Sequence, residues 1–280
     1  MNKLTTPIVV RGGGDLATGI IWQLCRAGYP VIILETGHPM AIRREAAFCE
    51  AVRFGEKTVE GVHCRRADSA EEALENVTPD HPMLLIDPEA KSLDLIRPFV
   101  LVDAILAKRN LGTRTDMADL VIGVGPGFTA GEDVDYVVET MRGHTLGRII
   151  AEGSAIPNTG IPGLIGGFAA ERVIHAPASG RLHCYAAIGD LVDKDQTIAE
   201  IETDDGTVIA VPAAISGVLR GILPDGYDVF RGLKMADIDP RKEQQINCFT
   251  ISDKARCIAG SVVTLVCAFE HGMTRGKADR

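Results

Sequence analysis

The stretch VVRGGGDLATG, residues 9–19, joins a short apolar run to a segment whose apolar residues recur with helical spacing. Gly12, Gly14 and Ala17 fit the pattern G-x-G-x-x-A. In a strand–turn–helix unit that binds a dinucleotide, the first glycine makes the turn and the second lets the backbone approach a pyrophosphate. Gly13 and Thr18 belong to the same predicted cradle, in which free amides at the helix start bind anionic oxygens. The alternative is a tight turn without a ligand.

An acidic residue at the end of the next apolar run is the expected companion of such a cradle. Glu35 ends VIILE, 21 residues after Gly14, where a carboxylate accepts a hydrogen bond from a ribose hydroxyl. Arg43 and Arg44 follow and offer positive charge to a phosphate. Asp15 places a negative charge beside the predicted anion site, although a carboxylate at a helix start is also an ordinary partner of the helix dipole.

The first half of the chain alternates apolar runs with helical patterns. Runs such as YPVIILET, HPMLLIDPE and FVLVDAIL are nearly continuous, which is typical of strands buried on both faces of a parallel sheet. Together with the glycine motif, they predict a Rossmann-like α/β domain over residues 1–150. A loop rich in glycine and proline is expected at 151–171.

A second glycine loop, GVGPGFTAGED at 123–133, follows the apolar run ADLVI. Ligands of open α/β sheets bind at the carboxyl ends of strands, where this loop is expected. No GK[ST] follows, so the loop is not a P-loop. Its small residues are candidates for holding a phosphate or a pterin, and they equally suit a loop that needs positive φ angles. They are Gly123, Gly125, Gly127 and Thr129.

The segment ETMRGHTLGR, residues 139–148, contributes charged candidates. On a strand, Arg142, His144 and Arg148 share parity and face the same side. Arginine suits anion binding and histidine suits proton transfer, so Arg142 and His144 are predicted binding residues. The alternative is a solvated edge with ion pairs between strands.

The last third of the chain contains an internal repeat. Residues 178–202 align with residues 215–239 at a shift of 37 without a gap, and seven of the 25 positions are identical. Each copy has the pattern strand, turn, short strand, strand, and two copies are needed to bury an apolar face. The pattern resembles the biotinyl/lipoyl carrier domain. Because the linking residues 203–213 contain no lysine, a non-acylated barrel-sandwich hybrid is predicted over 172–240.

The chain end is predicted to form a helix over 241–270 that packs back on the body, followed by a mobile tail at 271–280. Ser252 is the expected N-cap and Asp253 favours the positive end of the helix dipole. Apolar residues then recur with helical spacing as far as Phe269.

Composition narrows the classes of function. A net charge of −9 and 5% aromatic residues argue against a nucleic-acid partner. Absence of a long apolar run predicts no membrane span and a cytoplasmic protein. Seven cysteines without a CxxC pair and seven histidines without ligand spacing predict neither a disulfide framework nor a metal site. No nucleophile motif or catalytic triad is found, so catalytic residues stay unassigned.

Eight motifs occur in an order that resembles the YqeB-type selenium-dependent molybdenum hydroxylase system proteins. They are GGGDLATGI, PMAIRREAAFCEAV, LVDAILAKRNLGT, GVGPGFTAGEDV, ETMRGHTLGR, NTGIPG, KMADIDPR and CFTISDKA. The resemblance implies an accessory role in maturing molybdenum hydroxylases of this kind, with the hydroxylase or its other maturation proteins as partners. A homo-oligomer is compatible with it.

The ligand stays open between two candidates, a pterin dinucleotide form of the molybdenum cofactor and NAD(P). Two further hypotheses compete with the maturation role. Glu35 motivates an NAD(P)-dependent reductase acting on a small intermediate. The repeat without a carrier lysine motivates a non-catalytic scaffold that docks the hydroxylase.

Overall fold

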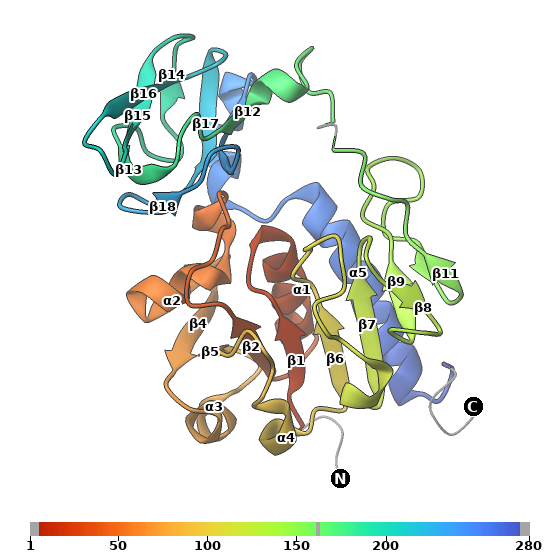
Figure 1. Ribbon diagram of the computed structural model, residues 1–280. Helices are drawn as coiled ribbons and strands as arrows, with labels where there is room; N and C mark the ends of the chain where they lie inside the picture. Colours follow the sequence, from red (N-terminus) through yellow and green to blue (C-terminus); the bar gives the residue numbers. More distant parts are fainter. Residues whose placement is uncertain (1–5, 161–162, 275–280) are drawn as a thin grey trace. The chain divides into compact units, whose positions relative to one another are not determined.

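The computed structural model describes residues 6–160 and 163–274 (Figure 1). Two compact units share the chain. Unit 1 comprises Met1–Pro39, Ala47–Thr159 and Ile251–Arg280, and unit 2 comprises Met40–Ala46 and Gly160–Thr250. Each unit is therefore assembled from segments that are distant in the sequence. No helix among the described residues has both the length and the apolar character needed to cross a membrane.

Unit 1 is built on a mixed sheet of nine strands. Its order is β10 (Ile149–Ile150), β9 (Tyr136–Val138), β7 (Leu120–Val124), β6 (Val100–Asp103), β1 (Ile8–Arg11), β2 (Val31–Glu35), β5 (Met83–Ile86), β4 (Val62–Ala67) and β3 (Glu56–Val59). Strands from β9 to β4 run parallel, whereas the edge strands β10 and β3 are antiparallel to their neighbours.

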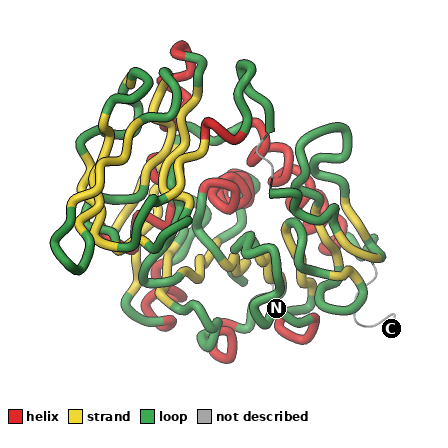
Figure 2. The backbone as a smooth tube through the Cα atoms, turned by 45° about the horizontal axis from the view of Figure 1, so that its top comes forward, coloured by secondary structure: helices red, strands yellow, loops and turns green. Residues whose placement is uncertain are grey.

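Helices cover both faces of this sheet (Figure 2). Helix α1 (Asp15–Arg26) and helix α5 (Asp253–Glu270) share one core with Ile8 and Val10 of β1. Val9 points to the opposite core, which also contains residues of α3 (Ala70–Asn76) and α4 (Leu93–Ile96). Both faces of the strands are thus buried, which explains their near-continuous apolar sequences. A one-turn helix α2 (Ala51–Phe54) and the short pair β8 (Thr129–Ala130) and β11 (Gly153–Ser154) complete the unit.

Unit 2 contains two four-stranded antiparallel sheets. The first has the order β12 (Val173–His175), β19 (Lys234–Asp239), β17 (Gly217–Ile222), β14 (Leu191–Val192). The second has the order β16 (Val208–Pro212), β15 (Thr197–Glu202), β13 (Gly180–Cys184), β18 (Asp228–Val229). Residues of both sheets contribute to a single core.

The internal repeat is visible in the backbone of unit 2. The strands β13, β14 and β15 recur as β17, β18 and β19 at the same shift of 37 residues. A Cβ at Gly180 would meet the Glu202 carbonyl oxygen at 2.2 Å, and at Gly217 it would meet that of Asp239 at the same distance. Both copies therefore use a glycine where two strands approach too closely for any side chain.

The predicted fold class, a Rossmann-like domain followed by a barrel-sandwich hybrid domain, is wrong. Instead of a domain complete by residue 150, the chain forms a large mixed sheet that the C-terminal helix α5 completes. One antiparallel edge arises because Glu60 and Gly61, with φ angles of 43° and 78°, turn β3 directly into β4. Two consecutive residues with positive φ form a tight hairpin, which the strand–helix alternation did not predict.

The segment expected as a helix from 241 is divided into two elements. Residues Lys242–Phe249 form the 3₁₀ element η6 in unit 2, and α5 begins only at Asp253. Ser252 accepts a hydrogen bond from the Ala255 amide, so the predicted N-cap is confirmed. Of the expected tail, residues 275–280 lie outside the described part of the chain.

Helices α1 and α5 approach each other closely at one glycine. A Cβ on Gly19 would lie 2.8 Å from the Ala255 Cβ and 3.0 Å from the Ala255 carbonyl carbon. The two helices can therefore lie this close only because residue 19 has no Cβ atom.

We expect Gly19→Ala to lower the free energy of unfolding by about 1–3 kcal/mol, because overpacking forces the helices apart. Gly260→Ala on α5 is a matched control, since its Cβ would meet only the Gln23 Oε1, at 4.0 Å. The control should raise stability by up to about 1 kcal/mol through helix propensity. Urea denaturation of both variants is the measurement, and equal shifts would show that the contact does not limit the packing.

Candidate functional site

The first glycine loop and Glu35 are brought together by direct hydrogen bonds. The Gly13 amide donates to Glu35 Oε2 and the Thr36 amide donates to Glu35 Oε1, each at 2.7 Å. Burial raises the pKa of the Glu35 carboxyl, while the two amides act in the opposite direction. Glu35 and the loop therefore bond to each other, although the sequence reasoning expected each to bind a ligand.

A neighbouring segment of unit 1 covers part of this loop. The Cys49 amide donates to the Gly13 carbonyl at 2.8 Å, and the Phe48 amide donates to Thr18 Oγ1 at 2.9 Å. Gly12 has a φ of 95°, and a Cβ there would lie 2.9 Å from the Ala104 carbonyl oxygen. Next to these close contacts, a Cβ on Gly14 would meet nothing within 4 Å.

The second glycine loop lies at the same carboxyl edge of the sheet, after β7. Gly125, with a φ of 84°, approaches the Thr140 side chain, and Gly127, with a φ of 114°, approaches the Arg109 backbone. Gly123 faces the Phe128 ring. Close contact between loops thus accounts for glycine at these places. Thr129 lies beyond them on β8, with its hydroxyl 3.1 Å from that of Ser154.

Residues 141–148 form turns, so the strand predicted for this segment is wrong. The reason is local, because the Glu139 backbone pairs with Gly147 and Arg148 and folds the segment back on itself. Arg142 and His144 consequently do not share a strand face. His144 is exposed, and Arg142 pairs with Asp253 of α5.

Arg43 and Arg44 belong to unit 2 and are held by carbonyl groups of that unit. Arg43 donates to the carbonyl oxygens of Asn247 and Thr250, each at 3.2 Å, and Arg44 donates to that of Ile222 at 2.8 Å. Ala17 is fully buried in α1. The structure therefore gathers the glycine loops, Glu35 and Arg142 within unit 1, and places the two other arginines in unit 2.

Three of the sequence motifs meet around Lys254, which lies in the first turn of α5. Its pKa is lowered by burial first and then by the nearby Arg142 guanidinium. The carboxylates of Asp15, Glu139 and Asp253 act on Lys254 in the opposite direction. This charged cluster, which we call the Lys254 cluster, combines Asp15 at the start of α1, residues Glu139 and Arg142 after β9, and Asp253 and Lys254 of α5.

Glu139 fixes the turn that carries Arg142. Its carboxylate accepts the amides of Thr140 and Met141 at 2.7 Å through Oε1, and that of Ile156 at 2.8 Å through Oε2. Arg142 in turn donates to both carboxylate oxygens of Asp253, at 3.1 and 3.4 Å. That ion pair is exposed to water, and ion pairs of this kind contribute about 1 kcal/mol or less to the free energy of unfolding.

Sequence reasoning missed Lys254, although a signal was present. Once Ser252 is identified as an N-cap, Lys254 falls in the first helical turn, where the helix dipole disfavours a cation. The proximity of Asp15 and Glu139 carried no signal, because these residues are more than a hundred positions from Lys254. Over residues 6–160 and 163–274, no group of three or more histidine, cysteine or acidic side chains is arranged to hold a metal ion.

We expect Glu35→Gln to lower the free energy of unfolding by about 1–3 kcal/mol, since one backbone amide would then face an NH₂ group. The pH dependence should also change. A carboxyl whose folded pKa is raised makes stability fall as pH rises from about 4.3 to the raised value, and the variant loses this contribution. Urea denaturation between pH 4 and 7 measures both effects.

Glu75→Gln is the control for Glu35, because Glu75 is exposed on α3. It should change the free energy of unfolding by no more than about 0.5 kcal/mol. A Glu35→Gln variant as stable as this control at every pH would contradict a role for the carboxylate in holding the loop.

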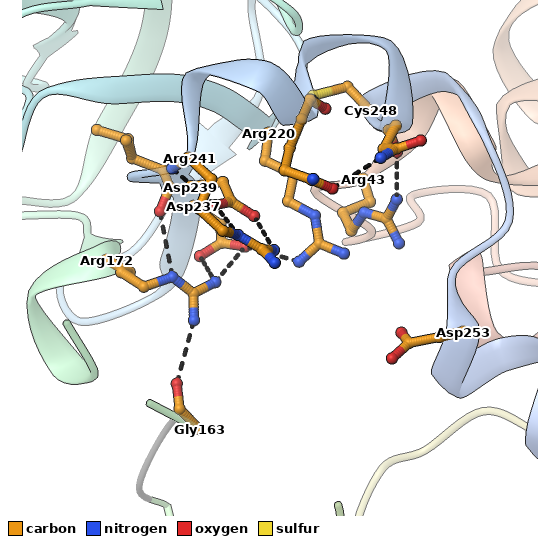
Figure 3. A network of polar contacts seen from close by, with 12 residues as sticks. Arg43, Gly163, Arg172, Arg220, Asp237, Asp239, Arg241, Cys248 and Asp253 are labelled. Carbon is orange, nitrogen blue, oxygen red and sulfur yellow. Dashed lines mark hydrogen bonds and ion pairs between the residues drawn. The ribbon is translucent and has the colours of Figure 1, made fainter. Parts of the chain in front are cut away.

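Unit 2 contains a buried network of arginine and aspartate side chains (Figure 3). Arg172 donates to both carboxylate oxygens of Asp237, at 3.1 and 3.4 Å, and Arg220 lies 3.7 Å from the same carboxylate. Arg241 donates to both oxygens of Asp239, at 3.0 and 2.8 Å. Alternate residues of β19 thus supply the two acids.

The charges of this network act on neighbouring groups. Although burial pushes the pKa of Asp239 upward, hydrogen bonds from Arg241 hold it below its ordinary value. Burial raises the pKa of the Cys248 thiol, against the opposing effect of Arg43 and Arg220. A deeply buried thiol of this kind is unreactive. The network therefore supports a structural role, tying η6 and the segment before β12 to β19.

We expect Asp237→Ala to lower the free energy of unfolding by about 3–5 kcal/mol, because it leaves the buried Arg172 charge uncompensated. Asp228→Ala is the matched control, since Asp228 and Arg181 form a 4.0 Å pair at the surface. Its cost should stay below about 1 kcal/mol. Thermal and urea denaturation of the two variants provide the comparison, and similar losses would contradict the structural role of the buried pair.

Comparison with known proteins gives one strong sequence match. The chain is 45% identical over 264 residues to the uncharacterized protein YqeB of Escherichia coli strain K12. The match covers 94% of this chain and 48% of the relative, so the chain spans about half of the relative's length. No family model matches.

Similar solved structures include a product-bound ectoine utilization protein EutE (DoeB) from Ruegeria pomeroyi, with 13% identity and a TM-score of 0.28. A succinylglutamate desuccinylase/aspartoacylase from Rhodobacter sphaeroides has 15% identity and a TM-score of 0.27. Both similarities cover 83% of this chain and 85% of the other. TM-scores of this size carry no argument about activity.

The predicted function in maturing selenium-dependent molybdenum hydroxylases is wrong, as are the reductase and scaffold alternatives. The geometry supplies a physical reason, because the Gly13 amide and the Glu35 carboxylate of the expected nucleotide site bond to each other. The sequence identity makes this chain similar to YqeB over about half of that protein's length.

Proposed function

We propose that unit 1 binds a small carbonyl compound at the carboxyl edge of its sheet and that Lys254 reacts with it through its amine. The observation that carries the proposal is the position of Lys254. A half-buried lysine lies in the first turn of an 18-residue helix, beside a second cation, Arg142. Each of these features disfavours the charged ammonium form.

A lysine amine reacts as a nucleophile only in its neutral form. Burial and a neighbouring cation are the two environments that raise the neutral fraction of such a lysine. Burial and Arg142 both lower the pKa of Lys254. Groups with a perturbed pKa at the loop edge of an α/β sheet are candidates for functional residues. The site therefore has the chemistry of an imine-forming lysine.

The reaction needs no group beyond the chain and water. The lone pair of neutral Lys254 Nζ attacks the carbonyl carbon, and the carbonyl π electrons move to oxygen to give a carbinolamine. Protonation of the hydroxyl group and loss of water then form the C=N bond, while Nζ gives up its protons to water or to a nearby carboxylate. Asp15 lies close enough to act on the charge of Lys254, so its carboxylate is the candidate proton acceptor.

Reductive trapping with propionaldehyde and cyanoborohydride near pH 7 tests the proposal. Lys91 is an internal reference, because it is exposed and its hydrogen bond to Glu89 raises its pKa. Peptide mass spectrometry should show Lys254 labelled faster than Lys91, since a lower pKa gives a larger fraction of neutral amine. Lys254→Met should abolish the fast label and leave Lys91 labelling unchanged. Labelling of Lys254 at or below the rate of Lys91 would overturn the proposal.

A further inference from the structure

Arg142 presents its guanidinium to a carboxylate immediately beside Lys254. Its two terminal nitrogens donate to the two oxygens of Asp253, the residue that precedes Lys254 in the chain. The side chains of Arg142 and Asp253 are 44% and 77% exposed, so water reaches this ion pair. The planar fork of arginine matches a carboxylate through two parallel hydrogen bonds, which lysine cannot do.

Asp253 thus shows what kind of group the fork accepts. Because the pair is exposed, the carboxylate of a small molecule can approach the Arg142 guanidinium from water. Arg142 itself is held in position by the turn that Glu139 fixes through three backbone amides. The backbone that carries Arg142 is therefore fixed, while its guanidinium stays accessible to water.

We infer that the carbonyl compound taken by Lys254 carries a carboxylate, which Arg142 binds in exchange for Asp253, so that the substrate class is 2-oxo acids. This inference rests on the proposed function, because it needs the amine of Lys254 to react. Arg142 bonds to Asp253, the residue next to Lys254 in the chain, so a ligand that meets both Arg142 and Lys254 needs its carboxylate and its carbonyl close together. Arg142 is then the specificity-determining residue and Lys254 the catalytic residue.

The acidic neighbours fit the same arrangement. Glu139 is buried and committed to backbone amides, so its carboxylate does not compete with the ligand for Arg142. Asp253 is the carboxylate that does compete. Asp15, at the start of α1, acts on the charge of the Lys254 amine, whereas Arg142 bonds to Asp253. Each charged group around Lys254 therefore has a separate part in the proposed binding.

Trapping with pyruvate and with acetone, which differ by one carboxylate, tests the inference on the full chain. The ratio of pyruvate to acetone labelling at Lys254 is divided by the same ratio at Lys91, which removes the difference in intrinsic carbonyl reactivity. We expect a quotient of at least about ten, equivalent to about 1.4 kcal/mol of preference. Arg142→Gln should return the quotient to about one. Asp253→Asn, which removes the competing carboxylate, should raise it.

The outcomes separate the inference from the proposed function. If acetone labels Lys254 faster than Lys91 but the quotient is near one, or if Arg142→Gln leaves it unchanged, the amine reacts and the assignment of 2-oxo acids is overturned. If neither compound labels Lys254 faster than Lys91, the proposed function fails and the inference fails with it. A quotient that depends on Arg142 and rises in Asp253→Asn supports both.

Discussion

The close packing of α5 against α1 is the contact on which the arrangement of unit 1 depends. A glycine at position 19 lets the backbone of α5 approach at Ala255, where even a methyl group would clash. This contact brings the first turns of both helices to one edge of the sheet, where Figure 1 shows them beside the ends of β1, β6 and β7. Residues of the two chain ends thereby become neighbours.

Two helix amino ends at one place create a region of positive potential. Acidic side chains are expected there, and Asp15, Glu139 and Asp253 are present around the same point. Lys254 and Arg142 are the exceptions, because a cation in this place gains nothing from either helix dipole. Function is the usual reason for a residue to break a local rule of this kind. The unfavourable position of Lys254 therefore agrees with the reactive role that we propose.

Carboxylates that accept backbone amides hold the loops at this edge. Glu35 binds two backbone amides, Glu139 binds three, and Asp87 accepts the amides of Lys91 and Ser92. Each acid therefore ties backbone amides of its loop to a single side chain. Loops fixed in this way keep Arg142 in place, which a flexible surface arginine would achieve only at an entropic cost.

Local patterns in the sequence predicted local structure well. The strand and helix on either side of the first glycine loop, the Ser252 cap and the 37-residue repeat are all present. Each depends on residues a few positions apart, or on a pattern that occurs twice. The prediction of a strand at 139–148 was wrong, because the same alternating polarity is compatible with a turn. In that turn the Glu139 carboxylate accepts the backbone amides of the next two residues. The hairpin between β3 and β4 was not predicted, because Glu60 adopts a positive φ angle that is unusual for a glutamate.

The sequence by itself determined the strand and helix around the first glycine loop, the Ser252 cap and the 37-residue repeat, because these follow from side-chain periodicity and backbone sterics. Only the tertiary structure decided that Glu35 binds the glycine loop, that Arg43 and Arg44 belong to unit 2, and that Lys254 lies beside Asp15 and Arg142. These relations depend on contacts between residues far apart in the chain. They are fixed by how the two helices pack and by which buried amides each carboxylate must satisfy, and neither is visible in a local stretch of sequence.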